Sequence, residues 1–309
     1  MLTRETLTGP WAGPPVAWTE QDEFDEATYR KDVVRCCEAG VPGVYTGGTT
    51  GEFYAMEFEE FKAVTRATVE ECKVHGVPVM IGCTSTYTLG AARRAAFAAE
   101  CGADAIQLTL PYWIEMEGSQ IVPFFKEVVA AAGGLPMSIY ELLRMKRILT
   151  LDEHRAMKDA VPNYLMVKAT RGTLGATQAG CEALSAFVNV FVGEHQWAEL
   201  GPSGASGSCS SVVYWNPRFT LDLWEHVEKQ EWSRVQAGCQ RIQDCFDFQD
   251  TAFEGRGFTA TAVDRLGGVA SGFLKTSLRN RGPYPSINED DVRIMRDWYR
   301  LQFPQMLEN

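Results

Sequence analysis

Short apolar runs alternate with longer amphipathic stretches along most of this chain. The runs are rich in valine, isoleucine, leucine and methionine, and they occupy residues 43–45, 77–81, 105–108, 137–140, 165–167 and 188–192. Short continuous runs of this kind are typical of strands that are buried on both faces of a sheet. The pattern therefore predicts a mostly parallel sheet rather than one with a solvated face.

The stretches between these runs have the spacing of helices. Residues 25–39 place apolar side chains three to four positions apart, and the alanine-rich residues 89–101 stop at a glycine. Thr150 and Glu153 form the sequence signature of a capping box. Each run together with its helix covers roughly 25 to 35 residues, which is the spacing of parallel βα units.

The number of repeated units predicts the fold. When residues 13–18 are taken as a first strand and residues 204–213 as a last one, the chain has eight strands. Eight βα units close into a TIM (β/α)8 barrel, for which about 250 residues are typical. We expect the barrel over residues 1–215 and a C-terminal helical extension over residues 216–309, packed on it within one domain. The apolar stripes of that extension are Trp224, Val227, Trp232, Val235, Cys239 and Ile242. A doubly wound open sheet remains the alternative.

Composition excludes several classes of protein. The 309 residues carry a formal net charge of -11, so we expect no nucleic-acid surface. No apolar run approaches the ~20 residues that span a bilayer, so we expect no membrane partner. The N-terminal residues lack the apolar core of a signal peptide, and nine cysteines without a CxxC pair indicate reduced thiols. These features predict a cytoplasmic protein.

Lys168 is the most informative residue, because it closes the apolar run that begins at Tyr164. Burial at a strand end disfavours an ammonium and can lower the pKa of a lysine by several units. A desolvated lysine amine attacks ketones and forms a Schiff base. Taken alone, the residue is also compatible with a lysine whose ammonium reaches solvent beyond the strand.

Other strand ends carry residues that suit chemistry, and the strand ends of a barrel share one face. The glycine and threonine loop at residues 46–52 offers backbone N–H groups and hydroxyls to an anion, or is simply a turn. Tyr140 ends the fifth predicted strand and could instead be a core tyrosine. Glu194 and His195 follow the seventh, as a solvated pair or a metal site. The other histidines have no ligand spacing, so we expect no metal.

Several of these motifs together resemble one known family. They are Gly48-Thr49-Thr50-Gly51-Glu52, Pro111-Tyr112, Tyr140, Lys168 within Val-Lys-Ala-Thr, and Gly204-Ala205-Ser206-Gly207. In order and spacing they are similar to the dihydrodipicolinate synthase/N-acetylneuraminate lyase superfamily. The resemblance implies a (β/α)8 barrel, a homotetramer or homodimer, and a class I lyase. It also implies that pyruvate or another 2-keto acid binds as a lysine imine, without a cofactor, and that an aldehyde is a further partner.

The resemblance also implies roles for individual residues. Lys168 would form the Schiff base and Tyr140 would move protons. Thr49 and Thr50 would hold the carboxylate of the keto acid, while Glu52 would be a structural anchor. The remaining substrate contacts implied are Gly48, Tyr112, Trp113, Thr170 and Gly207.

The chain departs from the pattern of the synthases at the positions that would meet the second substrate. Trp113 stands where a second tyrosine is usual, Glu141-Leu142-Leu143 replaces Asn-x-Pro, and Met145 replaces an arginine, with Arg144 out of register. We therefore do not expect the lysine-biosynthetic reaction. Trp113 and the residues after it are closer to hydratase-aldolases that act on arylidene pyruvates. A non-catalytic barrel that binds 2-keto acids is the alternative of another class.

Overall fold

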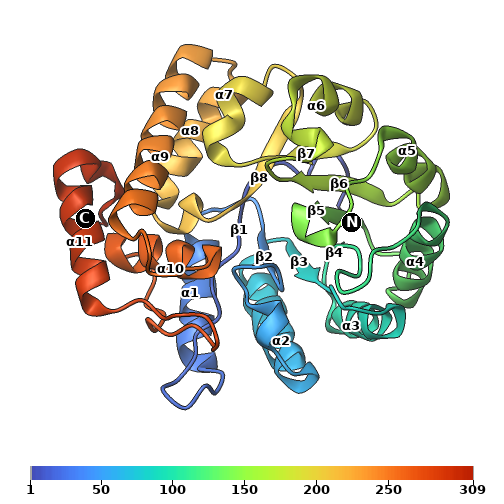
Figure 1. Ribbon diagram of the computed structural model, residues 1–309, viewed down its shortest axis with the longest axis horizontal. Coiled ribbons are helices and arrows are strands. Elements are labelled where there is room, and N and C mark those ends of the chain that lie inside the picture. Colours follow the sequence, from blue (N-terminus) through green and yellow to red (C-terminus); the bar gives the residue numbers. More distant parts are fainter. Residues whose placement is uncertain (1, 309) are drawn as a thin grey trace.

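Eight parallel strands close into a barrel in the computed structural model, which describes residues 2–308 (Figure 1). Each strand pairs with its sequence neighbours, and the last pairs with the first. The predicted (β/α)8 fold is confirmed and the open sheet is excluded. The strands are β1 (Gly9–Ala12), β2 (Val44–Thr46), β3 (Val79–Gly82), β4 (Ala105–Leu108), β5 (Met137–Glu141), β6 (Tyr164–Ala169), β7 (Asn189–Phe191) and β8 (Ala205–Ser210).

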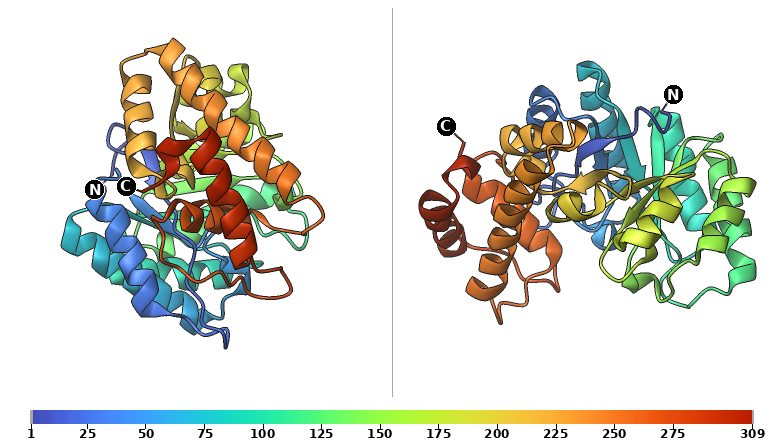
Figure 2. Two further views of the ribbon diagram at one scale, coloured as in Figure 1. Left: turned by 90° about the vertical axis from the view of Figure 1, so that its left-hand side faces the viewer. Right: turned by 90° about the horizontal axis from the view of Figure 1, so that it is seen from above.

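Helices surround the strands, and a further group stands at one side of the barrel (Figures 1 and 2). The surrounding helices are α1 (Glu26–Glu38), α2 (Phe58–His75), α3 (Thr88–Cys101), α4 (Gly118–Ala131), α5 (Leu151–Ala160), α6 (Gln178–Ser185), α7 (Trp197–Leu200) and α8 (Pro217–Glu228). The group at the side is α9 (Trp232–Ala252), α10 (Ala260–Ser271) and α11 (Glu289–Gln302). Short 3-10 turns are η1 (Phe53–Ala55), η2 (Leu143–Met145), η3 (Leu174–Ala176), η4 (Glu194–Gln196), η5 (Val212–Tyr214) and η6 (Pro304–Met306).

Two separate apolar clusters follow from the alternation of side chains along the strands. Outward-facing residues such as Ile139 and Val167 pack in one large cluster with the helices. Inward-facing Tyr45, Met166 and Phe191 belong to a smaller cluster that fills the barrel. The interior is thus a packed core. The end of the barrel that has room for chemistry is the one formed by the C-terminal ends of the strands.

Local sequence signals account for several helix ends. The side chain of Thr150 accepts a hydrogen bond from the backbone N–H of Glu153, and the carboxylate of Glu153 accepts one from the backbone N–H of Thr150, so the predicted capping box is confirmed. Helix α3 ends at Gly102, which has a left-handed φ of 88° that glycine adopts without strain.

The first predicted strand is wrong, because residues 13–18 follow β1 instead of forming it. Pro14 and Pro15 have no N–H to donate to a neighbouring strand, and the pairing ends at Ala12. The last strand is shorter than the predicted residues 204–213, since η5 begins at Val212. In both places, residues with the composition of a strand continue beyond the last residue of the strand, which is Ala12 in β1 and Ser210 in β8.

Helix α8 contacts β1 and completes the ring of helices around the barrel. We therefore propose that the extension begins at α9, one helix later than residue 216. Of the predicted apolar stripe, Val235, Cys239 and Ile242 are buried in α9. No helix among residues 2–308 combines the length and the apolar character needed to cross a membrane.

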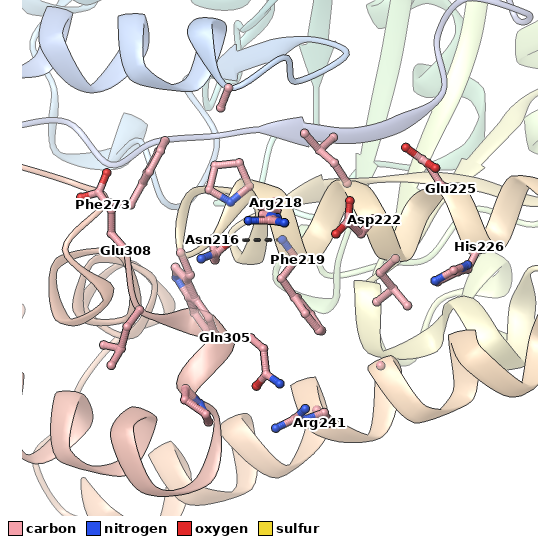
Figure 3. Close-up of a pocket in the computed structure, with 18 of the residues that line it drawn as sticks. Asn216, Arg218, Phe219, Asp222, Glu225, His226, Arg241, Phe273, Gln305 and Glu308 are labelled. Carbon is pink, nitrogen blue, oxygen red and sulfur yellow. Dashed lines mark hydrogen bonds between the residues drawn. The ribbon is translucent and has the colours of Figure 1, made fainter.

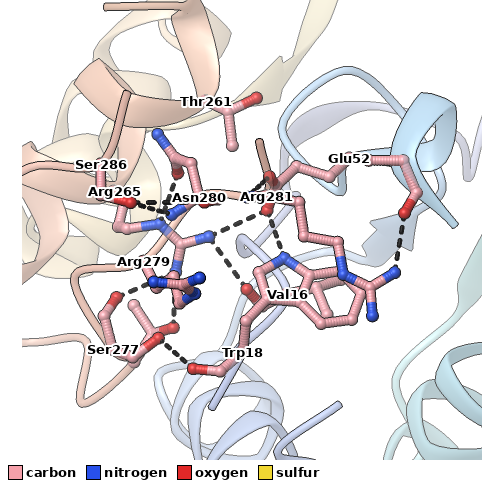
Figure 4. A network of polar contacts seen from close by, with 12 residues as sticks. Val16, Trp18, Glu52, Thr261, Arg265, Ser277, Arg279, Asn280, Arg281 and Ser286 are labelled. Atoms are coloured by element: carbon pink, nitrogen blue, oxygen red, sulfur yellow. Dashed lines mark hydrogen bonds and ion pairs between the residues drawn. The ribbon is translucent and has the colours of Figure 1, made fainter. Parts of the chain in front are cut away.

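A buried ion pair fastens the extension to the barrel (Figure 4). Arg265 of α10 donates to Glu52 at 3.1 Å, and neither side chain is exposed. Glu52 also accepts from the indole of Trp18 at 2.6 Å and from the backbone N–H of Arg281 at 2.9 Å. Burial raises the pKa of Glu52, and these donors oppose the shift. The network holds Glu52 in a left-handed conformation, with φ of 50°, directly after the threonine loop.

We expect Arg265→Met to lower the free energy of unfolding by about 3–5 kcal/mol, because it leaves the carboxylate of Glu52 buried without its cation. Arg279→Met is the matched control, since Arg279 pairs with Asp22 at the partly exposed surface. The control should cost no more than about 1 kcal/mol. Urea unfolding measures both, and equal losses would contradict a special role for the buried pair.

Candidate active site

Lys168 and Tyr140 lie side by side on neighbouring strands at the upper end of the barrel interior. The register of β5 and β6 pairs the two residues directly. Their neighbours Ile139 and Val167 face outward into the core, so both functional side chains face inward. The ammonium nitrogen of Lys168 lies 4.0 Å from the ring centroid of Tyr140 and 5.3 Å from that of Tyr45. Lys168 therefore stays inside the barrel mouth instead of reaching out past the strand.

The electrostatic environment of Lys168 differs from the one expected. Burial lowers the pKa of Lys168, but the acidic groups around it, first Tyr140 and Tyr45, outweigh burial and raise the pKa above its ordinary value. The prediction of a lowered pKa is thus wrong, because it considered desolvation without the neighbours that other strands bring.

The threonine loop reaches over the same end of the barrel. The hydroxyls of Thr49 and Tyr140 lie 3.3 Å apart, close enough for a hydrogen bond. The loop starts at Gly47, which has a φ of 72° and passes so close to β3 that a Cβ there would lie 2.5 Å from the carbonyl oxygen of Gly82. Glycine is required at this point, and the tight passage brings Thr49 to Tyr140.

A cavity of about 220 Å³ opens beside this pair. Its lining is largely aromatic and apolar, with an arginine at the mouth: Thr49, Phe53, Tyr54, Thr109, Tyr112, Tyr140, Leu142, Arg144, Met145, Thr259 and Tyr284. Met145 is buried, whereas Arg144 is exposed. A concave, mainly apolar hollow with a few polar groups is typical of a site for a small molecule.

Of the residues predicted for the site, Thr49, Tyr112 and Tyr140 line this cavity. The others lie outside its lining: Lys168, Gly48, Thr50, Trp113, Thr170 and Gly207. The hydroxyl of Thr50 donates to Asp264 at 2.6 Å, and that of Thr170 donates to the carbonyl of Glu141 at 2.9 Å. Trp113 is 76% exposed on the rim.

The two predicted glycines meet aromatic rings inside the barrel. A Cβ on Gly48 would lie 3.1 Å from the ring of Tyr45. A Cβ on Gly207 would lie 2.7 Å from the ring of Phe191, and Gly207 pairs with Gly9 on β1. Glycine at both positions leaves room for the rings of Tyr45 and Phe191 to pack.

Asp264 is a site residue that the sequence did not indicate. It belongs to α10, yet its carboxyl accepts the hydrogen bond from Thr50. Burial raises the pKa of Asp264, while hydrogen bonds from Thr50 and Ser211 and the charge of Lys168 oppose the shift. Thr259 and Tyr284 also reach the cavity from the extension. No sequence motif marks Asp264, Thr259 or Tyr284, because only the docking of the extension on the barrel brings them to the barrel mouth.

Glu141 follows Tyr140 on β5 and does not line the cavity. One of its oxygens accepts from the backbone N–H of Leu149 at 2.8 Å and lies 3.6 Å from His154. His154 in turn lies 2.9 Å from the hydroxyl of Tyr164. The departure at Glu141 therefore belongs to a polar contact between β5, β6 and α5.

A larger hollow of about 1100 Å³ lies between α8, α9 and the C-terminal residues (Figure 3). Its floor includes the start of α8, where Asn216 caps the backbone N–H of Phe219 at 3.0 Å. Tyr140 is not among its lining residues, whereas it lines the smaller cavity. We therefore place the chemistry in the smaller cavity, where Lys168 contacts the ring of Tyr140 without being part of the lining itself.

Glu194 and His195 do not form the solvated pair that the sequence allowed. Glu194 is buried and accepts from the hydroxyl of Ser208 at 3.3 Å, and burial raises its pKa. The ring of His195 packs against Phe246 with centroids 5.4 Å apart. Across residues 2–308, no three histidine, cysteine, aspartate or glutamate side chains gather as a metal site would require.

Two solved structures share this fold over nearly their whole length. YagE from E. coli K12, a prophage protein of the dihydrodipicolinic acid synthase family solved with pyruvate, has a TM-score of 0.82 and 21% identity, covering 95% of this chain and 98% of YagE. Wild-type sialic acid aldolase of Ruminococcus gnavus has a TM-score of 0.84 and 18% identity, covering 97% and 98%.

Sequence comparisons extend this likeness beyond the fold. An N-acetylneuraminate lyase from Escherichia coli (strain SE11) is 24% identical over 246 residues, which cover 77% of this chain and 81% of the lyase. The pattern that defines the dihydrodipicolinate synthetase family matches residues 8–255. The match includes the threonine loop, Tyr140 and Lys168. The chain belongs to the dihydrodipicolinate synthetase family.

Proposed function

We propose that this enzyme is a class I lyase that binds pyruvate or another 2-keto acid as a Schiff base on Lys168. The family is one of lyases, and similar proteins include a lyase and an aldolase by name. The observation that carries the proposal is the contact of Lys168 with the ring of Tyr140, whose side chain lines a mainly apolar cavity. The products are those of aldol cleavage or condensation, or of dehydration.

The proposed reaction begins when the ammonium of Lys168 gives up a proton to solvent. The free amine then adds to the ketone carbon, and the carbinolamine loses water to form a protonated imine. That imine accepts the electron pair left when the adjacent carbon loses a proton or when a C–C bond breaks. We assign the proton transfers to the hydroxyl of Tyr140, and Thr49, 3.3 Å away, orients it.

The cavity indicates the kind of second substrate. Phe53, Tyr112 and Tyr284 present aromatic surface, and buried Met145 stands where the synthases have an arginine. These side chains favour a bulky, weakly charged aldehyde over a small carboxylated one. Arg144 at the mouth is available to a polar group at the far end of such a substrate.

A hydratase-aldolase acting on arylidene pyruvates is the second candidate, and the aromatic lining of the cavity favours it. The third candidate is a binding protein and not an enzyme: a barrel that binds 2-keto acids without turnover. We further propose that the protein is a homotetramer or homodimer, since members of this family commonly form such assemblies. We also propose that it is cytoplasmic.

Pyruvate followed by borohydride is expected to add a reduced pyruvyl group to Lys168 alone, because this amine lies inside the barrel mouth. Mass spectrometry of peptides locates the group. Lys168→Arg should abolish labelling. Lys146→Arg is the control and should retain it, since Lys146 is exposed and lies over the ring of Trp113. Labelling at any other lysine contradicts the Schiff-base assignment.

Tyr140→Phe is expected to slow turnover roughly 10²–10⁴-fold, the usual effect of losing a positioned acid or base, while imine formation stays measurable. Thr49→Val should mainly weaken keto-acid binding. Tyr87→Phe serves as the control, because the ring of Tyr87 is exposed. Steady-state rates with borohydride trapping separate the two steps. Unchanged turnover in Tyr140→Phe would transfer the proton role to another group, such as water.

We expect weak or absent condensation of pyruvate with aspartate semialdehyde and better activity with an aromatic aldehyde. Met145 offers no charge to a second carboxylate, and Trp113 cannot pass on a proton as a tyrosine hydroxyl can. Steady-state kinetics with both aldehydes measure the preference. Arg144→Met controls for the guanidinium at the mouth. Efficient and selective use of the semialdehyde would contradict this interpretation.

A further inference from the structure

Asp264 lies at the centre of the contacts between the extension and the barrel mouth. Its carboxyl accepts from the hydroxyl of Thr50 at 2.6 Å, and its backbone oxygen accepts from the indole of Trp215 at 2.9 Å. Nearby on α10, the hydroxyl of Thr261 donates to the carbonyl of Thr49 at 2.9 Å. Figure 4 shows Thr261 and Arg265 facing the loop from this helix. The threonine loop and Asp264 are therefore held in fixed relation.

The hydroxyl of Thr50 is the group over which two anions compete. A threonine hydroxyl has one hydrogen and donates it to one acceptor at a time. In this structure that acceptor is Asp264. The family resemblance assigns the same hydroxyl to the carboxylate of the keto acid, and the proposal below carries that role over to Thr50. Asp264 thus occupies, from within the chain, the contact that the ligand requires.

The charges around Asp264 make this competition depend on protonation. The titratable groups that face it are Lys168 on β6, Tyr45 on β2, Glu194 in η4 and Tyr214 in η5. Burial raises the pKa values of Tyr45 and Tyr214. Burial also raises the pKa of Glu194, which favours its neutral form. Lys168 is thus the cation that an ionised Asp264 and a bound carboxylate would share.

Two carboxylates beside one ammonium in a buried site repel each other, and a proton on one of them relieves the repulsion. Glu52 does not enter this balance, because Arg265 and the indole of Trp18 already bind it. Asp264 is the acid in direct contact with Thr50. It is therefore the group to take up the proton.

We propose that Asp264 makes keto-acid binding proton-coupled. This proposal rests on the proposed function. The carboxylate of the keto acid replaces Asp264 at Thr50, and Asp264 takes up one proton from solvent as it does so. Affinity is then full below the pKa of Asp264 in the empty site and falls as the pH rises above it. With one proton coupled, the dissociation constant increases by up to about tenfold per pH unit.

Titration calorimetry in buffers of different ionisation enthalpy, from about pH 5.5 to about pH 8.5, measures affinity and proton uptake together. The probes are pyruvate and lactate, because lactate carries the carboxylate but has no ketone to form an imine. The wild-type enzyme is expected to take up close to one proton and to bind more weakly as pH rises. Asp264→Asn should take up none and bind about tenfold more tightly near pH 8, since its amide accepts the hydrogen bond without a charge.

Two further variants guard against a purely structural effect. Asp264→Glu keeps an ionisable carboxyl and should keep the proton uptake. Glu254→Gln removes an exposed carboxylate of the same extension and should leave the pH profile unchanged. Equal pH slopes in the wild type and Asp264→Asn overturn the proposal, and so does loss of proton uptake in both Asp264 variants.

Borohydride labelling of Lys168 distinguishes failure of this proposal from failure of the proposed function. Labelled Lys168 together with equal pH slopes overturns only the role of Asp264. Absence of labelling with every 2-keto acid overturns the Schiff-base function. The lactate titration still shows in that case whether a carboxylate displaces Asp264 from Thr50.

Discussion

The ion pair between Glu52 and Arg265 places two charges where neither side chain meets solvent. Such a pair is stable only when its remaining donors and acceptors are satisfied, and here Trp18, Arg281 and Asn280 provide those contacts. The position of Glu52 sets the loop that carries Thr49 and Thr50, and the position of Arg265 sets the helix that carries Asp264. Geometry at the barrel mouth therefore depends on a contact that takes no part in the chemistry.

The reactive end of the barrel combines an apolar wall with a small number of competing charges. Tyr140 faces Lys168 from the neighbouring strand β5 and Tyr45 faces it from β2, while Asp264 adds a carboxyl from outside the barrel. A lysine in such surroundings is held as an ammonium until a ligand changes the balance. Reactivity in this site is accordingly controlled by what enters the cavity and not by the lysine alone.

The sequence predicted those features that depend on short-range periodicity. The alternation of β5 and β6 placed Tyr140 and Lys168 on the inner face, and the capping box at Thr150 marked a true helix start. The first strand was misplaced because the prolines at 14 and 15 have apolar side chains but lack the donor that a strand needs. Asp264 could not be predicted, since its place depends on how a distant helix docks.

The hydrogen bond from Thr50 to Asp264 joins residues 214 positions apart in the chain, and the ion pair of Glu52 with Arg265 spans 213. Contacts of this range form late, because the chain must first close a very long loop. While the chain is being synthesised, the barrel strands emerge well before the helix that completes the binding face. A nascent chain that ends before residue 260 can already contain Lys168, but its Thr50 has no internal acceptor from α10. In the proposed binding mode, the contact that couples binding to a proton thus becomes available only after Asp264 has been synthesised.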